Sequence, residues 1–451
     1  MGVSTRHPDF IDHLGEWETM RDALDDEVKC KGIVYLPMTD GMAHLRKTDS
    51  VLADDIYASY RDRAMYPLWV KDAVRSMMGL VSRVKPNIEL PKRMEMMREN
   101  ATADGFSLNQ LFLRTVREVL ITGRRPMLTD IDDNGLPYIA LYTAESAINW
   151  KLTDQGGRQD LSLVVFTENC DVSRDEYGHE CETVYRVLRI EEGRYSVALV
   201  DESGEPVGDE VDPSDGRGQP ITYIPVVFCG STDNAPSVDE VPLLTMAKAA
   251  VKYYQLSADL YESLHKTAHP QAWVASDGDV KFETTGPATL WQLGSATASA
   301  GYLEITGVGI EKTAKAMEEQ RNAALEAGAR VMDVGGTESG EARKARQSDQ
   351  TATLSSIVMT VASAIQQSLE FAAEMVGADP KQVEFTVEPD FLTHVIDPQV
   401  LAQLNQALMA GSISNETWWT FLQKGVIPDR PWEEEALYID NPSGNVVRED
   451  E

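Results

Sequence analysis

Residues 335–350, GGTESGEARKARQSDQ, combine a glycine-rich turn with three basic side chains. Glycine-rich loops that lead into a helix can hold phosphate groups through backbone N–H donors. A nucleotide site of the Walker A type also needs a Gly-Lys pair followed by Ser or Thr, and no Lys follows Gly340. Two interpretations remain for Arg343, Lys344 and Arg346: a contact with nucleic acid, or the first turns of a capped helix.

The composition limits what such a basic segment can do. The chain of 451 residues carries 73 Asp plus Glu against 41 Lys plus Arg, for a net charge of -32. A molecule this acidic repels polyanions, so any contact with nucleic acid must be local and weak. A hydrophobic content of 42% is ordinary for a soluble globular protein, and four scattered cysteines fit a reducing compartment.

A second candidate site is the segment DIDDNG, which fits the first half of a calcium-binding loop. Its ligands would be Asp130, Asp132 and Asn134, but Leu141 stands where the loop needs a bidentate Glu. Asn134-Gly135 between two strand-like runs is typical of a β-hairpin. The sequence therefore predicts a hairpin turn, with a metal-dependent hydrolase using the carboxylates near Asp130 as the alternative.

Other groups of potential ligands are weaker. Cys170, His179 and Cys181 lack a fourth ligand and match no common zinc spacing. His265 and His269 stand at the end of a predicted helix, where its dipole favours a positive charge. The chain contains no HExxH, GxSxG or GxGxxG motif. We therefore expect a protein that is not an enzyme, with no catalytic residues, no cofactor and no metal site.

The first half of the chain changes from helix to strand. The first 50 residues look polar and irregular, an arm with room for one short helix, and residues 51–85 look helical with a break at Pro67. Ser107 should cap a helix that ends at Gly123. Strand-like runs and acid-rich loops then make residues 124–230 β-rich.

The second half is mainly helical. Two long helices, 241–268 and 308–332, bracket short strands and turns in 271–305. A third helix, 340–376, has an apolar stripe at helical spacing, and its start carries the basic residues. A helical pair follows Asp397, and Ser414 should cap its second helix. No apolar run is long enough to span a membrane.

This order of elements resembles the portal proteins of tailed bacteriophages, from about Tyr57 to Asp440. The resemblance rests on the succession of several segments that are individually weak. They are YASYRDRAMYPLWVKDAVRSMMGLVSRVKP, AESAINWKL, VPLLTMAKAAVKYYQLSADLYESLHKTAHP and ALMAGSISNETWWTFLQKGVIP.

The resemblance implies an α+β fold divided in the manner of a portal subunit. An N-terminal arm, 1–50, would precede a wing, 51–238, that has a helical start and a β-rich part, 124–230. The remaining parts would be the first stem helix 239–268, the clip 269–305, the second stem helix 306–332, the tunnel loop 333–340, the long wing helix and strand 341–395, and a short helical crown with an acidic tail 396–451.

The resemblance also implies a function and a set of partners. Copies of the chain, commonly twelve, would form a ring at one capsid vertex and conduct double-stranded DNA during packaging and ejection. Implied partners are the large terminase, a head-tail adaptor, and the major capsid and scaffolding proteins, with no membrane. The ring would be assembled in the bacterial host cytoplasm and would reside in the virion. A scaffolding or capsid component is a third hypothesis, which gives no reason for the long helix pair.

The channel residues implied by the resemblance lie in the glycine-rich, basic segment 335–350. They are Gly335, Gly336, Thr337, Glu338, Ser339, Gly340, Arg343, Lys344 and Arg346. A channel wall through which DNA must slide should be mainly acidic, with few and weak basic contacts. Arg343, Lys344 and Arg346 could equally pair with acids of a neighbouring subunit.

Overall fold

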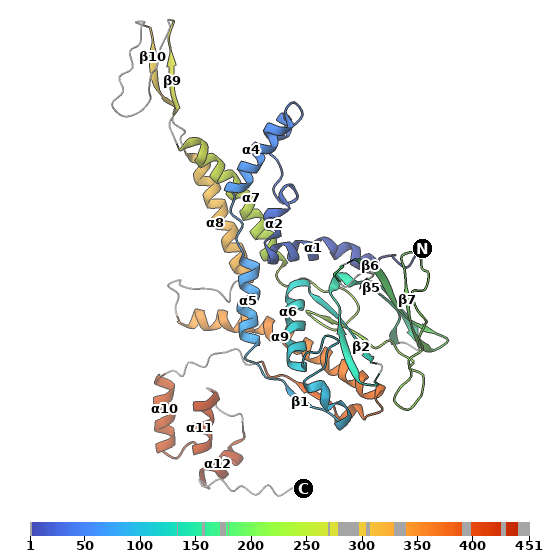
Figure 1. Ribbon diagram of the computed structural model, residues 1–451. Helices are drawn as coiled ribbons and strands as arrows, with labels where there is room; N and C mark the ends of the chain where they lie inside the picture. The colour runs from blue at the N-terminus through green and yellow to red at the C-terminus, as the bar shows by residue number, and fades with distance from the viewer. Residues whose placement is uncertain are drawn as a thin grey trace. The chain divides into compact units, whose positions relative to one another are not determined.

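The computed structural model describes residues 2–132, 134–155, 158–171, 177–178, 180–268, 271–277, 297–303, 307–328, 340–389, 398–424 and 430–440 (Figure 1). The chain divides into two compact units, Met1–Asp390 and Phe391–Glu451. Long helices and four antiparallel sheets make the protein α+β, as the sequence predicts. No helix among the described residues is long and apolar enough to cross a membrane.

The first 50 residues form several helices. They are α1 (Pro8–Asp25), α2 (Glu27–Cys30), a 3-10 turn (Gly32–Val34) and α3 (Asp40–Leu45). The prediction of a polar, irregular segment is therefore wrong. Phe10, Trp17 and Met20 are buried, and they follow a helical spacing that is interrupted by many acids. His7 caps the start of α1, and Pro8 suits its first turn.

The next helices follow the predicted breaks. α4 (Ser50–Arg63) and α5 (Trp69–Val81) lie on either side of Pro67. β1 (Asn87–Glu89) and a 3-10 helix (Lys92–Arg98) precede α6 (Leu108–Thr122). Ser107 Oγ accepts from the Gln110 N–H at 3.3 Å, and Gly123 ends the helix at φ 71°. Both predicted caps of α6 are confirmed.

Two antiparallel sheets fill the predicted β-rich region. A three-stranded sheet has the order β3-β2-β8, with β2 (Arg124–Ile131), β3 (Pro137–Leu141) and β8 (Val226–Gly230). After a 3-10 turn (Ala144–Ser146), a four-stranded sheet runs in chain order. Its strands are β4 (Ala147–Gln155), β5 (Arg158–Asp171), β6 (Cys181–Glu191) and β7 (Arg194–Val200). The segment of β4 was not predicted as a strand.

The same turn occurs three times in this region, at Asp132, Asp201 and Asp215. Each Asp Oδ1 accepts from the backbone N–H groups two and four residues later, at 2.7–2.9 Å. The glycine three residues after each Asp has a positive φ of 77°, 88° or 75°. An L side chain rarely adopts this backbone, so glycine suits the fourth position of each turn. The hairpin predicted at Asn134-Gly135 is confirmed.

The two predicted long helices are α7 (Leu244–Thr267) and α8 (Val308–Ala327), and they pack side by side (Figure 1). Residues 329–332, the predicted end of the second helix, lie outside the described residues. Between the helices in the chain, β9 (Gln271–Ala275) and β10 (Ser299–Leu303) form an antiparallel hairpin. We call α7 and α8 the helix pair and β9–β10 the hairpin.

The third long helix, α9 (Gly340–Met375), is continuous over 36 residues. Of its predicted apolar stripe, Leu354, Ile357, Val361, Ile365 and Leu369 are buried. Gly377, at φ 68°, follows its end as predicted. A 3-10 turn (Pro380–Gln382) then leads to β11 (Glu384–Thr386), which pairs with β1. Helix α9 packs on β2, β8, α6 and β11, so it belongs to the core of the first unit.

The second unit contains α10 (Pro398–Met409), α11 (Asn415–Lys424) and α12 (Trp432–Asp440). Gly411, at φ 69°, follows α10, and Ser414 Oγ accepts from the Thr417 N–H at 3.0 Å, as predicted. Helix α12 was not predicted. Its Glu435 is buried and binds the start of α11, which explains why a segment rich in acids folds here. Asp397, the other predicted cap, lies outside the described residues.

Candidate functional site

The basic segment is part of the start of α9. Gly340 is the first residue of the helix, and Arg343, Lys344 and Arg346 follow within its first two turns. Residues three and four apart share a helix face, so positions 343, 346 and 350 share one. The other predicted channel residues, 335–339, lie outside the described residues, and for 340–352 the backbone alone is described.

The rest of α9 is fixed by the body of the first unit. Thr129 Oγ1 donates to the Ser368 carbonyl at 3.1 Å, and Gln366 Oε1 accepts from the Phe385 N–H at 2.7 Å. Leu354 is the first buried residue among the side chains that the structure describes on this helix. A helix of this length spans about 54 Å, so these contacts of its second half lie far along the helix from the basic start.

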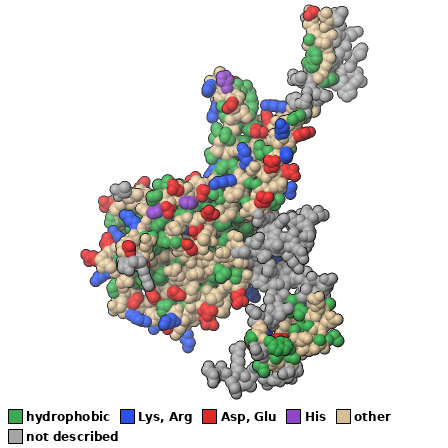
Figure 2. All heavy atoms as spheres, turned by 180° about the vertical axis from the view of Figure 1, so that it is seen from behind, with side chains coloured by type: hydrophobic (Ala, Val, Ile, Leu, Met, Phe, Trp, Pro, Cys, Tyr) green, Lys and Arg blue, Asp and Glu red, His purple; other side chains and the backbone are tan. Residues whose placement is uncertain are grey.

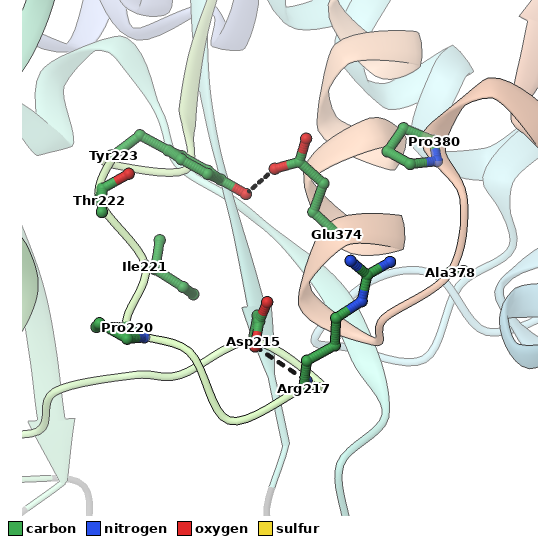
Figure 3. Close-up of a pocket in the computed structure, with 9 residues that line it drawn as sticks. All are labelled: Asp215, Arg217, Pro220, Ile221, Thr222, Tyr223, Glu374, Ala378 and Pro380. Atoms are coloured by element: carbon green, nitrogen blue, oxygen red, sulfur yellow. Dashed lines mark hydrogen bonds between the residues drawn. The ribbon is translucent and has the colours of Figure 1, made fainter.

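The C-terminal end of α9 is held against the loop that ends in Tyr223 (Figure 3). The Tyr223 hydroxyl donates to Glu374 Oε2 at 2.7 Å, and its ring stacks on Phe371 at 4.9 Å. Burial and the bond to Glu374 raise the pKa of the Tyr223 hydroxyl. Arg93 Nη1 donates to the Val376 carbonyl at 2.9 Å. These contacts give a carbonyl at the end of α9 a hydrogen-bond partner and fix the position of its last turn.

A small open pocket of about 300 Å³ lies at this junction. Figure 3 shows the Arg217 side chain between the loop and the end of α9, with the bonded pair Tyr223 and Glu374 beside it. Tyr223 and Glu374 are hydrogen-bonded to each other, so both side chains take part in holding the loop against the end of α9.

The helix pair is tied to the N-terminal helices through α7. The Tyr60 hydroxyl donates to Asp259 Oδ1 at 2.6 Å, and Arg63 forms an ion pair with Glu262. Ser257, fully buried on α7, accepts from the Met65 N–H at 2.9 Å through its Oγ. Tyr60 and Asp259 are 199 positions apart in the sequence. No local sequence pattern links residues so far apart, so the sequence could not predict these contacts.

Helix α8 makes far fewer contacts within its own chain. Only Met317 and Ala324 are buried among its 20 residues, seven positions apart on the face toward α7. Charged side chains of both signs cover the part of the molecule that the helix pair forms (Figure 2). A single stripe buried against one neighbour is the pattern of a two-helix contact, and it leaves the other faces of α8 open.

The hairpin carries two exposed aromatic side chains. Trp273 on β9 is opposite Gly301 on β10, and a Cβ on Gly301 would lie 3.2 Å from the indole nitrogen. The indole thus lies across Gly301, in space that a side chain at position 301 would otherwise fill. Trp273 is 44% exposed and Tyr302 is 53% exposed. Large exposed aromatic groups are typical of binding surfaces.

The carboxylates near Asp130 are occupied by local bonds. Asp132 Oδ1 accepts two backbone N–H groups, which lower the pKa of Asp132. Burial raises the pKa of Asp130, whose Oδ1 accepts from the Ile131 N–H at 2.8 Å. Among the residues that the structure describes, no group of three His, Cys, Asp or Glu could hold a metal ion. These contacts give Asp130 and Asp132 structural roles.

The suggested cysteine and histidine ligands are not brought together within the described part. Cys170 is opposite Glu182, and Cys181 is opposite Asp171, so their side chains leave opposite faces of the β5–β6 pair. Both thiols are free and exposed. His179 and His269 lie outside the described residues, and His265 is in the last turn of α7.

Comparison with known proteins finds one family match and several similar solved structures. Residues 242–376, from α7 to the end of α9, match a family described as a domain of unknown function, DUF4055. No curated protein matches the chain. The chain is similar to a solved structure of the virion of a native gene transfer agent particle, at 13% identity and a TM-score of 0.42, covering 82% of this chain and 89% of that one.

Two further solved structures are similar. One is the neck of an empty gene transfer agent particle, computed with C6 symmetry, at 14% identity and a TM-score of 0.42, covering 80% of this chain and 91% of that one. The other is an HK97-family phage portal protein from Corynebacterium diphtheriae, at 14% identity and a TM-score of 0.31, covering 74% of this chain and 99% of that one.

Proposed function

We propose that this chain is the subunit of a phage portal, a ring at one capsid vertex that conducts DNA during packaging and ejection. The observation that carries the proposal is the helix pair that brackets the hairpin, with α8 buried along one stripe only. Long helices of this kind, set beside copies of themselves, build the wall of a tube. The order of elements along the chain is that of the family it resembles.

The exposed faces of α8 support assembly. An isolated helix is marginal in water, and most helical stability in proteins comes from packing. With two buried side chains in 20 residues, α8 receives little of that packing from its own chain. Alternating charges such as Glu311, Lys312, Lys315 and Glu318 give it the means to pair with copies of itself. In the ring, neighbouring helix pairs cover these faces.

In this proposal the parts take the roles that the resemblance gives them. The helix pair is the stem, the hairpin belongs to the clip, the sheets and α9 to the wing, and the second unit to the crown. Residues 333–340 would form the tunnel loop, and Arg343, Lys344 and Arg346 follow it at the start of α9. The fixed C-terminal half of α9 holds that start at a constant radius.

The chemistry of a DNA conduit fits the charge of the chain. A net charge of -32 repels the duplex from the wall, and three basic residues per subunit give weak contacts that salt screens. The exposed aromatic groups Trp273 and Tyr302 on the hairpin would anchor the terminase during packaging and the adaptor afterwards. The capsid and scaffolding proteins would surround the wing. Twelve copies is the number common in the family.

Imaging purified full-length protein by negative-stain electron microscopy tests the proposal. We expect rings with a central opening wide enough for a duplex, and class averages that give the copy number. A variant with Met317→Asp, which places a charge in the stripe between α7 and α8, should disrupt the rings. The matched control Asn322→Gln, on an exposed and uncharged position of the same helix, should leave them intact. A single subunit at every salt condition would contradict the proposal.

A further inference from the structure

The N-terminal segment, residues 2–9, crosses the edge of the four-stranded sheet. Strand β4 is at one edge of that sheet, and the His7 N–H donates to the Ile148 carbonyl on it at 2.8 Å. A cavity of about 920 Å³ lies between this segment and strands β4, β5 and β6. Gly2, Val3 and Arg6 form one wall, and Trp150 and Leu163 belong to the other.

His7 makes three contacts that fix the segment. Its imidazole stacks on the Trp150 indole with ring centroids 4.0 Å apart and planes at 17°. Its Nδ1 accepts from the Asp9 N–H at 3.2 Å, which caps α1. Its own N–H makes the bond to β4. The second of these contacts depends on the protonation state of the ring, because only an unprotonated Nδ1 can accept a hydrogen bond.

The Trp150 ring already has a cation on it. The Arg124 guanidinium is 4.1 Å from the Trp150 centroid and 4.2 Å from that of Phe228. Two planar groups this close to one ring must lie on its two faces. Arg124 is fully buried, and only its Nη2 has a protein partner, the Pro236 carbonyl at 2.8 Å. Protonated His7 would thus be a second cation on the same indole.

The charges around His7 shift its pKa in both directions. Burial lowers its pKa, the Asp9 carboxylate 3.8 Å away raises it, and Arg124 lowers it, with a net value below the ordinary 6.5. Arg6 precedes it in the segment, and Lys151 on β4 also lines the cavity. No carboxylate other than that of Asp9 lines the cavity. The folded protein therefore favours neutral His7.

We propose that His7 is a pH-sensitive latch. When neutral, it fastens residues 2–9 to the edge of β4; when protonated, it loses the helix cap and the segment leaves. Release removes one wall of the cavity and exposes the edge of β4, a surface to which an extended chain can add. The latch depends on the contacts of His7 with the Asp9 N–H, the Trp150 ring and the Ile148 carbonyl, so it does not rest on the proposed function.

The sign of the effect follows from the two protonation states. The released segment binds a proton with the ordinary pKa of 6.5, and the docked one with a lower pKa. Docking is thus fully stable above pH 6.5 and weakens as the pH falls below it. Between the two pKa values, each pH unit raises the released fraction about tenfold.

Hydrogen exchange measured by mass spectrometry on the full-length protein tests the latch. Exchange of peptides covering residues 2–12 and 146–152 is compared at pH 7.5, 6.5 and 5.5, after correction for the intrinsic rate. We expect exchange to rise as the pH falls through this range, while a peptide from α6 stays protected. In His7→Asn the amide side chain caps the helix but does not titrate, so the rise should disappear.

Two further variants keep the test decisive. His13→Asn, on the same helix, should retain the full pH response of the wild type. Asp9→Asn removes the carboxylate that favours the cation, so docked His7 should resist protonation more and release should be greater at pH 5.5. A pH response that persists in His7→Asn, or a wild-type protein without any response, would overturn the proposal.

Discussion

The backbone of Gly216 touches the backbone of Val376: a Cβ added to Gly216 would lie 2.5 Å from the Val376 carbonyl carbon. Real Cβ atoms essentially never come this close to another atom, so the loop can hold the end of α9 only with glycine at this position. The contact joins the acid-rich loop between β7 and β8 to the helix that carries the basic segment.

Gly216→Ala should therefore lower the free energy of unfolding. We expect a loss of about 1–3 kcal/mol, because backbone must move to accommodate the methyl group. Denaturant unfolding followed by circular dichroism measures it. Gly208→Ala is the matched control: its added Cβ meets nothing within 4 Å, so its stability should stay near that of the wild type. Equal losses in both variants would show that the close approach is unimportant.

Ser257→Ala should loosen the attachment of α7 to the segment after α4. The Ser257 hydroxyl accepts from the Met65 N–H, and without it this part-buried donor loses its partner. An unsatisfied donor costs about 1–3 kcal/mol, so the melting temperature should fall. Ser263→Ala, six residues later on the same helix, is the control and should have little effect. An unchanged melting temperature for Ser257→Ala would contradict this role.

The second unit should be sensitive to acid through Glu435. Burial alone would raise the pKa of Glu435, but hydrogen bonds from Ser414 and Thr417 and the charge of Arg430 hold it below 4.5. Its stabilising effect is therefore present above pH 4.5 and is lost as the pH falls through the lowered value. Hydrogen exchange of residues 398–424 should increase over that range.

Glu435→Gln supplies the comparison for this acid response. The amide cannot titrate, so the second unit should be less stable at pH 7 and its exchange should depend less on pH. Glu434→Gln, an exposed neighbour, should behave as the wild type. If Glu435→Gln kept the full acid response, another group would have to be its source.

Replacing the basic residues at the start of α9 separates their two possible partners. In a variant with Arg343→Gln, Lys344→Gln and Arg346→Gln, we expect rings to form and their weak retention of double-stranded DNA to decrease. The wild-type retention should itself fall as salt rises, because it depends on counterion release. Electron microscopy and filter binding measure the two properties. Loss of the rings would instead indicate pairing with acids of a neighbouring subunit.

Local signals in the sequence predicted the long elements well. The stripes of α7 and α9 recur over many turns, and Ser107, Gly123 and Ser414 are caps that act on adjacent residues. Each of these features is decided by neighbours in the chain. Helix α1 was missed because its apolar residues are separated by acids, although Phe10, Trp17 and Met20 follow a helical spacing.

Features that depend on distant residues could not be predicted in the same way. Trp17 donates through its indole N–H to the Thr122 carbonyl, 105 residues away, and this bond fixes α1 against the end of α6. The half-buried Arg21 binds both Glu118 and Glu145. A single sequence carries no sign of such pairs, because any Arg and any Glu could make them. The site residues near the start of α9 were identified by resemblance and not by such contacts.

Helix α8 buries two side chains against its own chain, and this has a thermodynamic consequence. In the proposed ring neighbouring copies cover its open faces, so mass action would govern the order of α8. Dilution of the protein should melt α8 before the sheets, and the midpoint of thermal unfolding should rise with protein concentration. A subunit built this way couples the completion of its own fold to the presence of its neighbours.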